Sequence, residues 1–156
     1  MKRTIEEMYN KYKTSECVCN TCVSACSNKP GWFLPGEAEK AAKLKGMSFE
    51  KFFSEFLAVD YFIACEDIFI LSPVVKGNPP GTTFPSHPGG VCIFLKDGRC
   101  EIHTAKPFEC KLDQHSQDTS LTHEEVAEIW ADEKHQSQVA ELLGYKPVRG
   151  INHDTL

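Results

Sequence analysis

A run of four cysteines near the N-terminus constrains this chain more than any other feature of its sequence. Cys17, Cys19, Cys22 and Cys26 follow one another in the order C-x-C-x2-C-x3-C. A protein core uses cysteine as a scattered small hydrophobe and does not require such a dense run. Thiolates this close in sequence can instead converge on one soft metal centre. The run therefore predicts a protein that holds a metal.

A second group of cysteines, at Cys92, Cys100 and Cys110, raises the number of candidate thiols to seven. A tetrahedral zinc ion takes four ligands, so the thiols could hold one cluster with spares, one zinc with redox cysteines, or two centres that share ligands. The excess of cysteine and the scarcity of histidine near the first run favour an iron–sulfur cluster over zinc. The predicted ligands are Cys17, Cys19, Cys22, Cys26, Cys92, Cys100 and Cys110.

The remaining cysteine and three basic residues complete this prediction. Cys65 lies in an apolar stretch and is predicted to be a buried structural thiol. Four thiolates on zinc or on an oxidised four-iron cluster leave a net charge of about −2. Arg99, Lys106 and Lys111 are close enough in sequence to offset that charge. His103 is the histidine inside the cysteine frame. We expect it to be a half-exposed histidine at a strand end; the alternatives are a metal ligand or a hydrogen-bond donor to a cluster sulfur.

The composition excludes several other classes of protein. The net charge of −5 disfavours nucleic acid as the main partner, because a nucleic-acid-binding surface is normally basic. No apolar run reaches the length of a membrane span, and the N-terminus lacks the apolar region of a signal peptide. These features predict a cytoplasmic protein without a membrane partner. The reducing cytosol disfavours disulfides, so the cysteines are expected to bind metal or serve redox chemistry. A protein partner is left open.

Hydrophobic periodicity predicts an α+β fold, with short helices around a small antiparallel sheet or hairpin and a cysteine-ligated centre that organises them. The whole chain, 1–156, is expected to form one domain, in which 15–112 is the metal-binding region and 119–144 forms a C-terminal helix or two helices. The predicted helices cover 4–13, 35–45, 49–57 and 122–143, and the predicted strands cover 67–71, 91–95 and 99–103.

The turn of the predicted hairpin decides which cysteines share a face. A two-residue turn at Asp97-Gly98 would pair Cys100 with Leu95 and place Cys92 on the opposite face. A three-residue turn with Gly98 as a left-handed bulge would pair Cys100 with Phe94, and the two cysteines would then be diagonal neighbours on one face. We expect the bulged turn.

Three stretches of the chain together form a recognisable motif. They are Cys19-x2-Cys22-x3-Cys26 followed by Lys29-Pro30-Gly31-Trp32, then Cys92-Ile93-Phe94-Leu95 with Asp97-Gly98-Arg99-Cys100-Glu101-Ile102, and last Lys106-Pro107-Phe108-Glu109-Cys110. The motif resembles that of the YkgJ-like cysteine-cluster proteins, which are described as zinc- or iron-chelating domains. This chain departs from the family pattern at Ser27, Lys106 and His103. The resemblance covers about residues 15 to 112 and implies metal binding.

Two alternatives to a structural or redox metal protein stay open. The lysine-N-methylases of flagellin carry a related cysteine pattern, so a metal-dependent enzyme acting on a protein or peptide is one alternative. It would need an open coordination position at the metal, or a pocket lined by the loop 76–90 and by His103. The other is a zinc-stabilised interaction module that uses Trp130 and the half-polar last helix as its docking surface. No hydrolase or nucleotide-binding motif is present.

Overall fold

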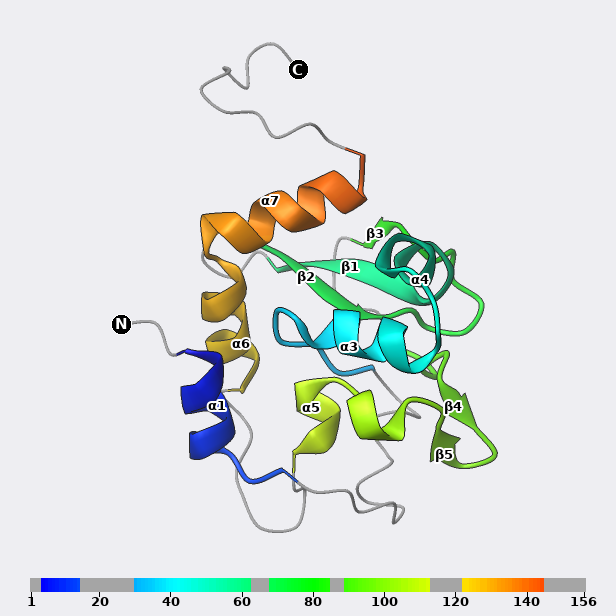
Figure 1. Ribbon diagram of the computed structural model, residues 1–156, viewed down its shortest axis with the longest axis horizontal. Coiled ribbons are helices and arrows are strands. Elements are labelled where there is room, and N and C mark those ends of the chain that lie inside the picture. The colour runs from blue at the N-terminus through cyan, green and yellow to red at the C-terminus, as the bar shows by residue number, and fades with distance from the viewer. Residues whose placement is uncertain (1–3, 15–29, 63–67, 85–88, 113–121, 145–156) are drawn as a thin grey trace.

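The computed structural model describes residues 4–14, 30–62, 68–84, 89–112 and 122–144. In this part of the chain, short helices surround a small mixed sheet, and a separate hairpin lies at the periphery (Figure 1). The mixture of helices and small sheets agrees with the predicted α+β class. The helices are α1 (Ile5–Lys11), α3 (Glu37–Leu44), α4 (Phe49–Phe56), the 3-10 helix η1 (His103–Ala105), α5 (Phe108–Lys111), α6 (Thr122–Trp130) and α7 (Glu133–Leu142). The strands are β1 (Leu57–Phe62), β2 (Ile68–Pro73), β3 (Thr83–Phe84), β4 (Leu95–Lys96) and β5 (Arg99–Cys100).

The main sheet has the strand order β2-β1-β3. β1 pairs antiparallel with β2, with Val59 opposite Leu71, and parallel with the short β3. β1 was not predicted, because the helical stripe of phenylalanines was extended through Leu57. The helix instead ends at Phe56, and Leu57 adopts an extended conformation as the first residue of β1. The antiparallel sheet expected from the sequence is therefore a mixed one.

The helix ends follow the capping chemistry of the sequence. The hydroxyl of Thr4 accepts a hydrogen bond from Glu7 N (3.1 Å) while Thr4 N donates to the Glu7 carboxylate (3.0 Å), so the two residues form a capping box at the start of α1. Ser48 caps α4 in the same way, with its hydroxyl accepting from Lys51 N. The C-terminal segment divides into α6 and α7 at Asp132, whose carboxylate accepts from Lys134 N (2.9 Å). Of the two predictions for this segment, one helix or two, the structure shows two helices.

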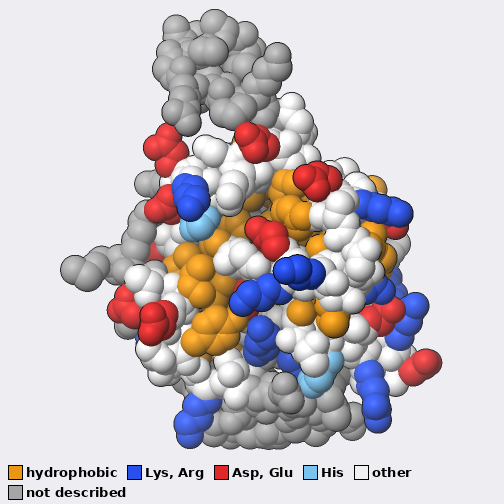
Figure 2. All heavy atoms as spheres, viewed as in Figure 1, with side chains coloured by type: hydrophobic (Ala, Val, Ile, Leu, Met, Phe, Trp, Pro, Cys, Tyr) orange, Lys and Arg blue, Asp and Glu red, His pale blue; other side chains and the backbone are white. Residues whose placement is uncertain are grey.

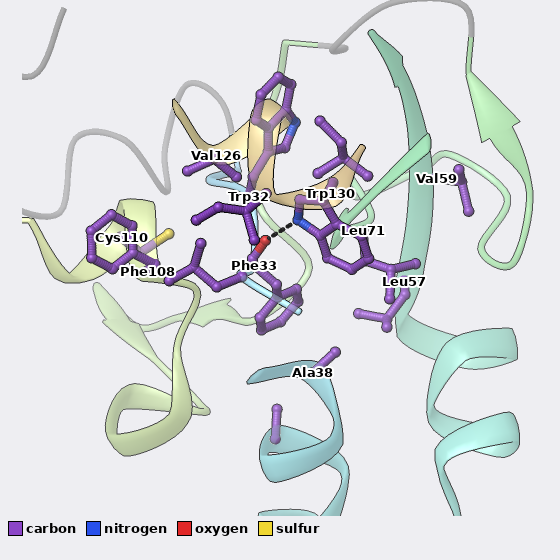
Figure 3. Close-up of a cluster of buried hydrophobic side chains, with 14 of the residues drawn as sticks. Trp32, Phe33, Ala38, Leu57, Val59, Leu71, Phe108, Cys110, Val126 and Trp130 are labelled. Carbon is purple, nitrogen blue, oxygen red and sulfur yellow. Dashed lines mark hydrogen bonds between the residues drawn. The ribbon is translucent and has the colours of Figure 1, made fainter. Parts of the chain in front are cut away.

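The hydrophobic core lies where the helices meet the sheet. α6 and α7 pack against β2, α4 packs against β1, and α3 packs against α4 and η1. The apolar segment Trp32–Leu34 enters the middle of this core and is at most 2% exposed, as its sequence predicted. Trp130 Nε1 donates a hydrogen bond to Phe33 O (2.7 Å), which fixes α6 to that segment (Figure 3). The core therefore has extensive apolar packing of its own, in addition to any contribution from a metal.

A buried carboxylate, Glu37 at the start of α3, joins three segments of the chain. One of its oxygens accepts hydrogen bonds from Leu34 N (2.7 Å) and Phe108 N (2.9 Å). The other accepts from the hydroxyl of Tyr9 and lies 3.4 Å from Lys111 Nζ. Phe108 N is an unpaired donor of the first turn of α5, so Glu37 caps that short helix from outside. The carboxylate thus holds α1 and α5 against α3.

Tyr9 should make the stability of the protein fall at high pH. Burial, the nearby charge of Glu37 and the hydrogen bond to it all raise the pKa of the Tyr9 hydroxyl above its ordinary value. A hydroxyl whose pKa is higher in the folded chain than in the unfolded chain stabilises the fold below about pH 10. This contribution is lost as the pH rises beyond that value, because the hydroxyl then ionises in the unfolded chain. The Tyr9 residue is 36% exposed, and screening by water limits the size of the effect. We expect Tyr9→Phe to be less stable than the natural chain at neutral pH and to lose less stability between about pH 9 and 11. Urea unfolding across that pH range measures the free energy of unfolding of both proteins. If the two free energies change with pH in parallel, the prediction is contradicted.

Candidate metal centre

The hairpin that carries Cys100 closes through a two-residue turn. Asp97 and Gly98 have φ angles of 50° and 76°, and the flanking pairs are Lys96 with Arg99 and Leu95 with Cys100. Positive φ at both central residues is typical of the type I′ turn that Asp-Gly favours. Gly98 is left-handed as predicted. The bulged three-residue turn was wrong, because Asp97 accepts a positive φ and the turn needs no bulge.

Cys92 does not belong to the hairpin strand. The predicted strand over 91–95 is reduced to Leu95–Lys96, because a turn intervenes in which Leu95 N donates to Cys92 O (3.0 Å). Cys92 forms an isolated β-bridge with Val75 instead, and it is 2% exposed. The predicted diagonal pairing of Cys92 with Cys100 across two strands is therefore wrong. Cys100, at the end of β5, is partly exposed.

Cys110 lies on α5 and faces the segment that follows the first cysteine run. The residue is 7% exposed and packs in the hydrophobic cluster drawn in Figure 3. A Cβ placed on Gly31 would lie 2.9 Å from Cys110 Sγ and 2.8 Å from Glu109 Cβ. Only a residue without a side chain fits at that distance, so the chain at Gly31 passes directly over the sulfur.

The residues on both sides of the first cysteine run meet the Cys110 segment. Thr14 forms an antiparallel β-bridge with Leu112, two residues beyond Cys110, and Gly31 contacts the Cys110 sulfur. Residues 15–29, which contain the whole run, therefore start and finish beside the same short segment. The predicted ligands Cys17, Cys19, Cys22 and Cys26 lie outside the described residues, as does Cys65.

The later cysteines do not make a metal site among themselves. Within residues 4–14, 30–62, 68–84, 89–112 and 122–144, no three cysteine, histidine or carboxylate side chains come close enough together to hold a metal ion. Cys92 and Cys110 are buried and Cys100 is less so; Cys100 lies in β5 and Cys110 in α5, whereas Cys92 lies outside the named helices and strands. A metal at Cys110 would thus need further ligands from residues outside these ranges.

Carboxylates that the sequence prediction missed surround the Cys110 corner. Glu109 is buried, and its Oε1 accepts a hydrogen bond from Trp32 N (2.7 Å) while its Oε2 lies 2.7 Å from His123 Nδ1. Asp60, also buried, accepts from Trp32 Nε1 (2.7 Å). These groups fix Trp32, and with it Gly31, against α5. A charged residue inside an apolar stretch, as at Asp60, was the available signal.

The basic residues expected to offset the charge of the centre have other neighbours. Lys111 Nζ lies 3.4 Å from the Glu37 carboxylate, and Arg99 is exposed on the hairpin. Lys106 is buried with its Nζ 3.4 Å from His103 Nδ1, and His103 is partly exposed at the start of η1. Lys106 and His103 thus contact each other, and His103 follows Cys100 by three residues.

The described residues define an α+β fold in which Thr14 and Gly31, on either side of the first cysteine run, both lie beside the Cys110 segment. The chain matches no known protein-family model, and no curated protein or solved structure matches it either. No helix in the described part of the chain is long and apolar enough to cross a membrane.

Proposed function

We propose that this chain is a metalloprotein whose cysteine thiolates hold an iron–sulfur cluster, with a zinc ion as the alternative. One observation carries the proposal: both ends of the segment that contains the first cysteine run are anchored at the segment that contains Cys110. The resemblance of the cysteine spacing to YkgJ-like proteins points the same way, and a reducing, cytoplasmic location would keep the thiols available. The ligands are drawn from Cys17, Cys19, Cys22, Cys26, Cys92, Cys100 and Cys110.

The length of chain between the anchors and the first run limits how far its outer thiols can lie from Cys110. Cys17 follows Thr14 by three residues, and Cys26 precedes Gly31 by five. Because an extended chain spans at most about 3.3–3.6 Å per residue, the two cysteines lie within roughly 10 Å and 17 Å of their anchors. The Cα atoms of Thr14 and Leu112 are themselves about 5 Å apart in such a bridge. Cys17 and Cys26 can therefore reach the neighbourhood of Cys110 without rearrangement of the described fold.

The donor set at this corner suits a soft metal. Thiolates are the ligands that iron–sulfur clusters and structural zinc prefer. Cys110 is almost completely buried, as a ligand shielded from water would be, and the chain at Gly31, five residues after Cys26, packs directly against its sulfur. When bound, the centre would cross-link the N-terminal segment to α5, and a cluster could also carry an electron. One groove on the described surface includes Pro80 and Gly81 of the 76–90 loop but not His103, so it is not the pocket that the enzyme alternative would use.

Metal and sulfide analysis of the purified protein tests the proposal. Purified without oxygen, the full chain is expected to be brown and to contain iron and acid-labile sulfide in equal amounts. A colourless protein with one equivalent of zinc would select the alternative metal. A protein that contains neither metal, and takes up neither when it is offered Fe²⁺ with sulfide or Zn²⁺, would contradict the proposal.

A further inference from the structure

A groove of about 610 Å³ opens on a part of the molecule that the metal proposal does not use. Its walls come from the start of α3, from α4, from the end of α6 and from α7, with β2 at the base. In Figure 2, hydrophobic side chains reach the surface in the area where Figure 1 places α3, α4 and α7, and acidic side chains lie beside them. A volume of this size is typical of a binding site.

The base of the groove is apolar. Phe53, Leu71, Trp130 and Val139 line it, and each of them is at most 4% exposed. Trp130 Nε1 already donates to Phe33 O, so the tryptophan offers the groove its ring and not its polar atom. Phe49 and Leu142, which are partly buried, extend the apolar surface toward the rim. Such a base binds aliphatic and aromatic side chains, and its tryptophan ring can also bind a cation.

The rim of the groove is acidic. Glu39, Glu50 and Glu141 stand at its edge on three different helices, and all three are exposed. In the described part of the chain, no lysine, arginine or histidine lines the groove. The rim therefore attracts cations and repels phosphate and carboxylate groups, which argues against nucleic acid and anionic lipid as occupants.

The groove is preformed on a rigid support. Gln136 at the start of α7 forms two hydrogen bonds with the backbone of Phe69, each 2.9 Å long: its Oε1 accepts from Phe69 N, and its Nε2 donates to Phe69 O. The same side chain donates to Trp130 O (2.7 Å). α7 is thus fixed to both β2 and α6, and a ligand need not spend binding energy on ordering the walls.

From these features we propose that the groove binds a linear segment of a partner protein that carries lysine or arginine beside aliphatic or aromatic side chains. The apolar residues of that segment would lie on Phe53, Trp130 and Val139, and its cations would face Glu39, Glu50 and Glu141. Charge complementarity selects this class of partner, and the open, several-helix rim suits a peptide better than a compact small molecule. The proposal uses no residue of the metal centre, so either can fail without the other.

Selection from a phage-displayed library of random dodecapeptides on the immobilised full-length protein tests this proposal. We expect the selected peptides to combine lysine or arginine with aliphatic or aromatic residues. The most enriched peptide, made synthetically with a fluorophore, should bind about 3- to 10-fold more weakly to the double variant E50Q/E141Q, because each exposed charge pair contributes modestly. The matched variant E124Q/E128Q, which changes two exposed glutamates of α6 outside the groove, should bind as the natural protein does.

Three results would overturn the proposal. The first is a selection that enriches no peptide or enriches acidic ones. The second is an equal effect, or no effect, of the two double variants on the affinity of the enriched peptide. The third concerns the C-terminal residues 145–156, which also carry Lys146 and Arg149 beside apolar residues. If a synthetic 145–156 peptide displaces the selected peptide at lower concentration than the unlabelled selected peptide itself, the occupant is this chain's own terminus and not a partner.

Discussion

Cys110→Ser is expected to lose its metal and to loosen the N-terminal part of the fold while leaving the main sheet intact. Replacement of a residue that only orients a metal ligand typically lowers affinity 10- to 100-fold, so loss of a ligand should cost at least about 100-fold. The loosening follows from the geometry, because the Cys110 segment holds both Thr14 and Gly31. We expect faster hydrogen exchange in α1 and near Leu112, and unchanged exchange in β1 and β2.

Metal content and hydrogen exchange of Cys110→Ser and of two companion variants measure this effect. Cys22→Ser, in the middle of the first run, should lose metal in the same way while Cys110 itself is unchanged. Cys65→Ala, which removes the cysteine outside the proposed ligand set, should keep its metal. The prediction fails if Cys110→Ser keeps its full metal content, or if Cys65→Ala loses as much as the other two.

Glu37→Ala should lower the free energy of unfolding by about 3–5 kcal/mol, which is the usual cost of removing one partner from a buried charged pair. The substitution leaves the buried donors Leu34 N and Phe108 N without their acceptor and leaves Lys111 without its carboxylate. It also releases the hydroxyl of Tyr9. Because Glu37 caps α5, the helix that carries Cys110, the variant should bind metal more weakly as well.

Glu39→Ala is the matched control for this effect. Glu39 lies two residues further along α3 and is exposed, and surface substitutions of this kind usually change stability by less than about 0.5 kcal/mol. Urea unfolding of the natural chain and both variants at neutral pH gives the comparison. Equal stability of Glu37→Ala and Glu39→Ala would show that the hydrogen bonds of Glu37 do not contribute the expected free energy of unfolding.

Local chemistry explains which elements could be predicted from the sequence. The capping residues Thr4 and Ser48 indicate the starts of α1 and α4, because each accepts a hydrogen bond from a backbone N–H in the first turn of its helix. The wholly polar stretch around Asp132 likewise announces the break between α6 and α7. β1 was missed because Leu57 also fits the helical stripe. The pairing of β1 with β2 determines that Leu57 is in a strand. That pairing is a contact between separate segments, which periodicity does not contain.

The candidate site was harder to predict for a related reason. Cysteine spacing indicated which thiols are candidates, and it indicated nothing about the turn at Asp97-Gly98 or the bridge of Cys92 with Val75. The parts played by Glu109 and Asp60 depend on Trp32, which is far from both in sequence. A buried carboxylate finds its partners only when the chain folds, so the sequence could mark Asp60 as unusual without naming what it binds.

Residues 15–29 are already closed into a ring by the protein itself. Thr14 and Gly31 hold the two ends in place, so most of the entropy of gathering distant thiols is lost during folding and not during metal uptake. For thiols on a segment anchored at both ends in this way, a short tether raises the effective concentration near the anchor above that of free thiols in solution. A metal bound by the proposed thiols would then be able to dissociate and rebind while β1 and β2 remain folded.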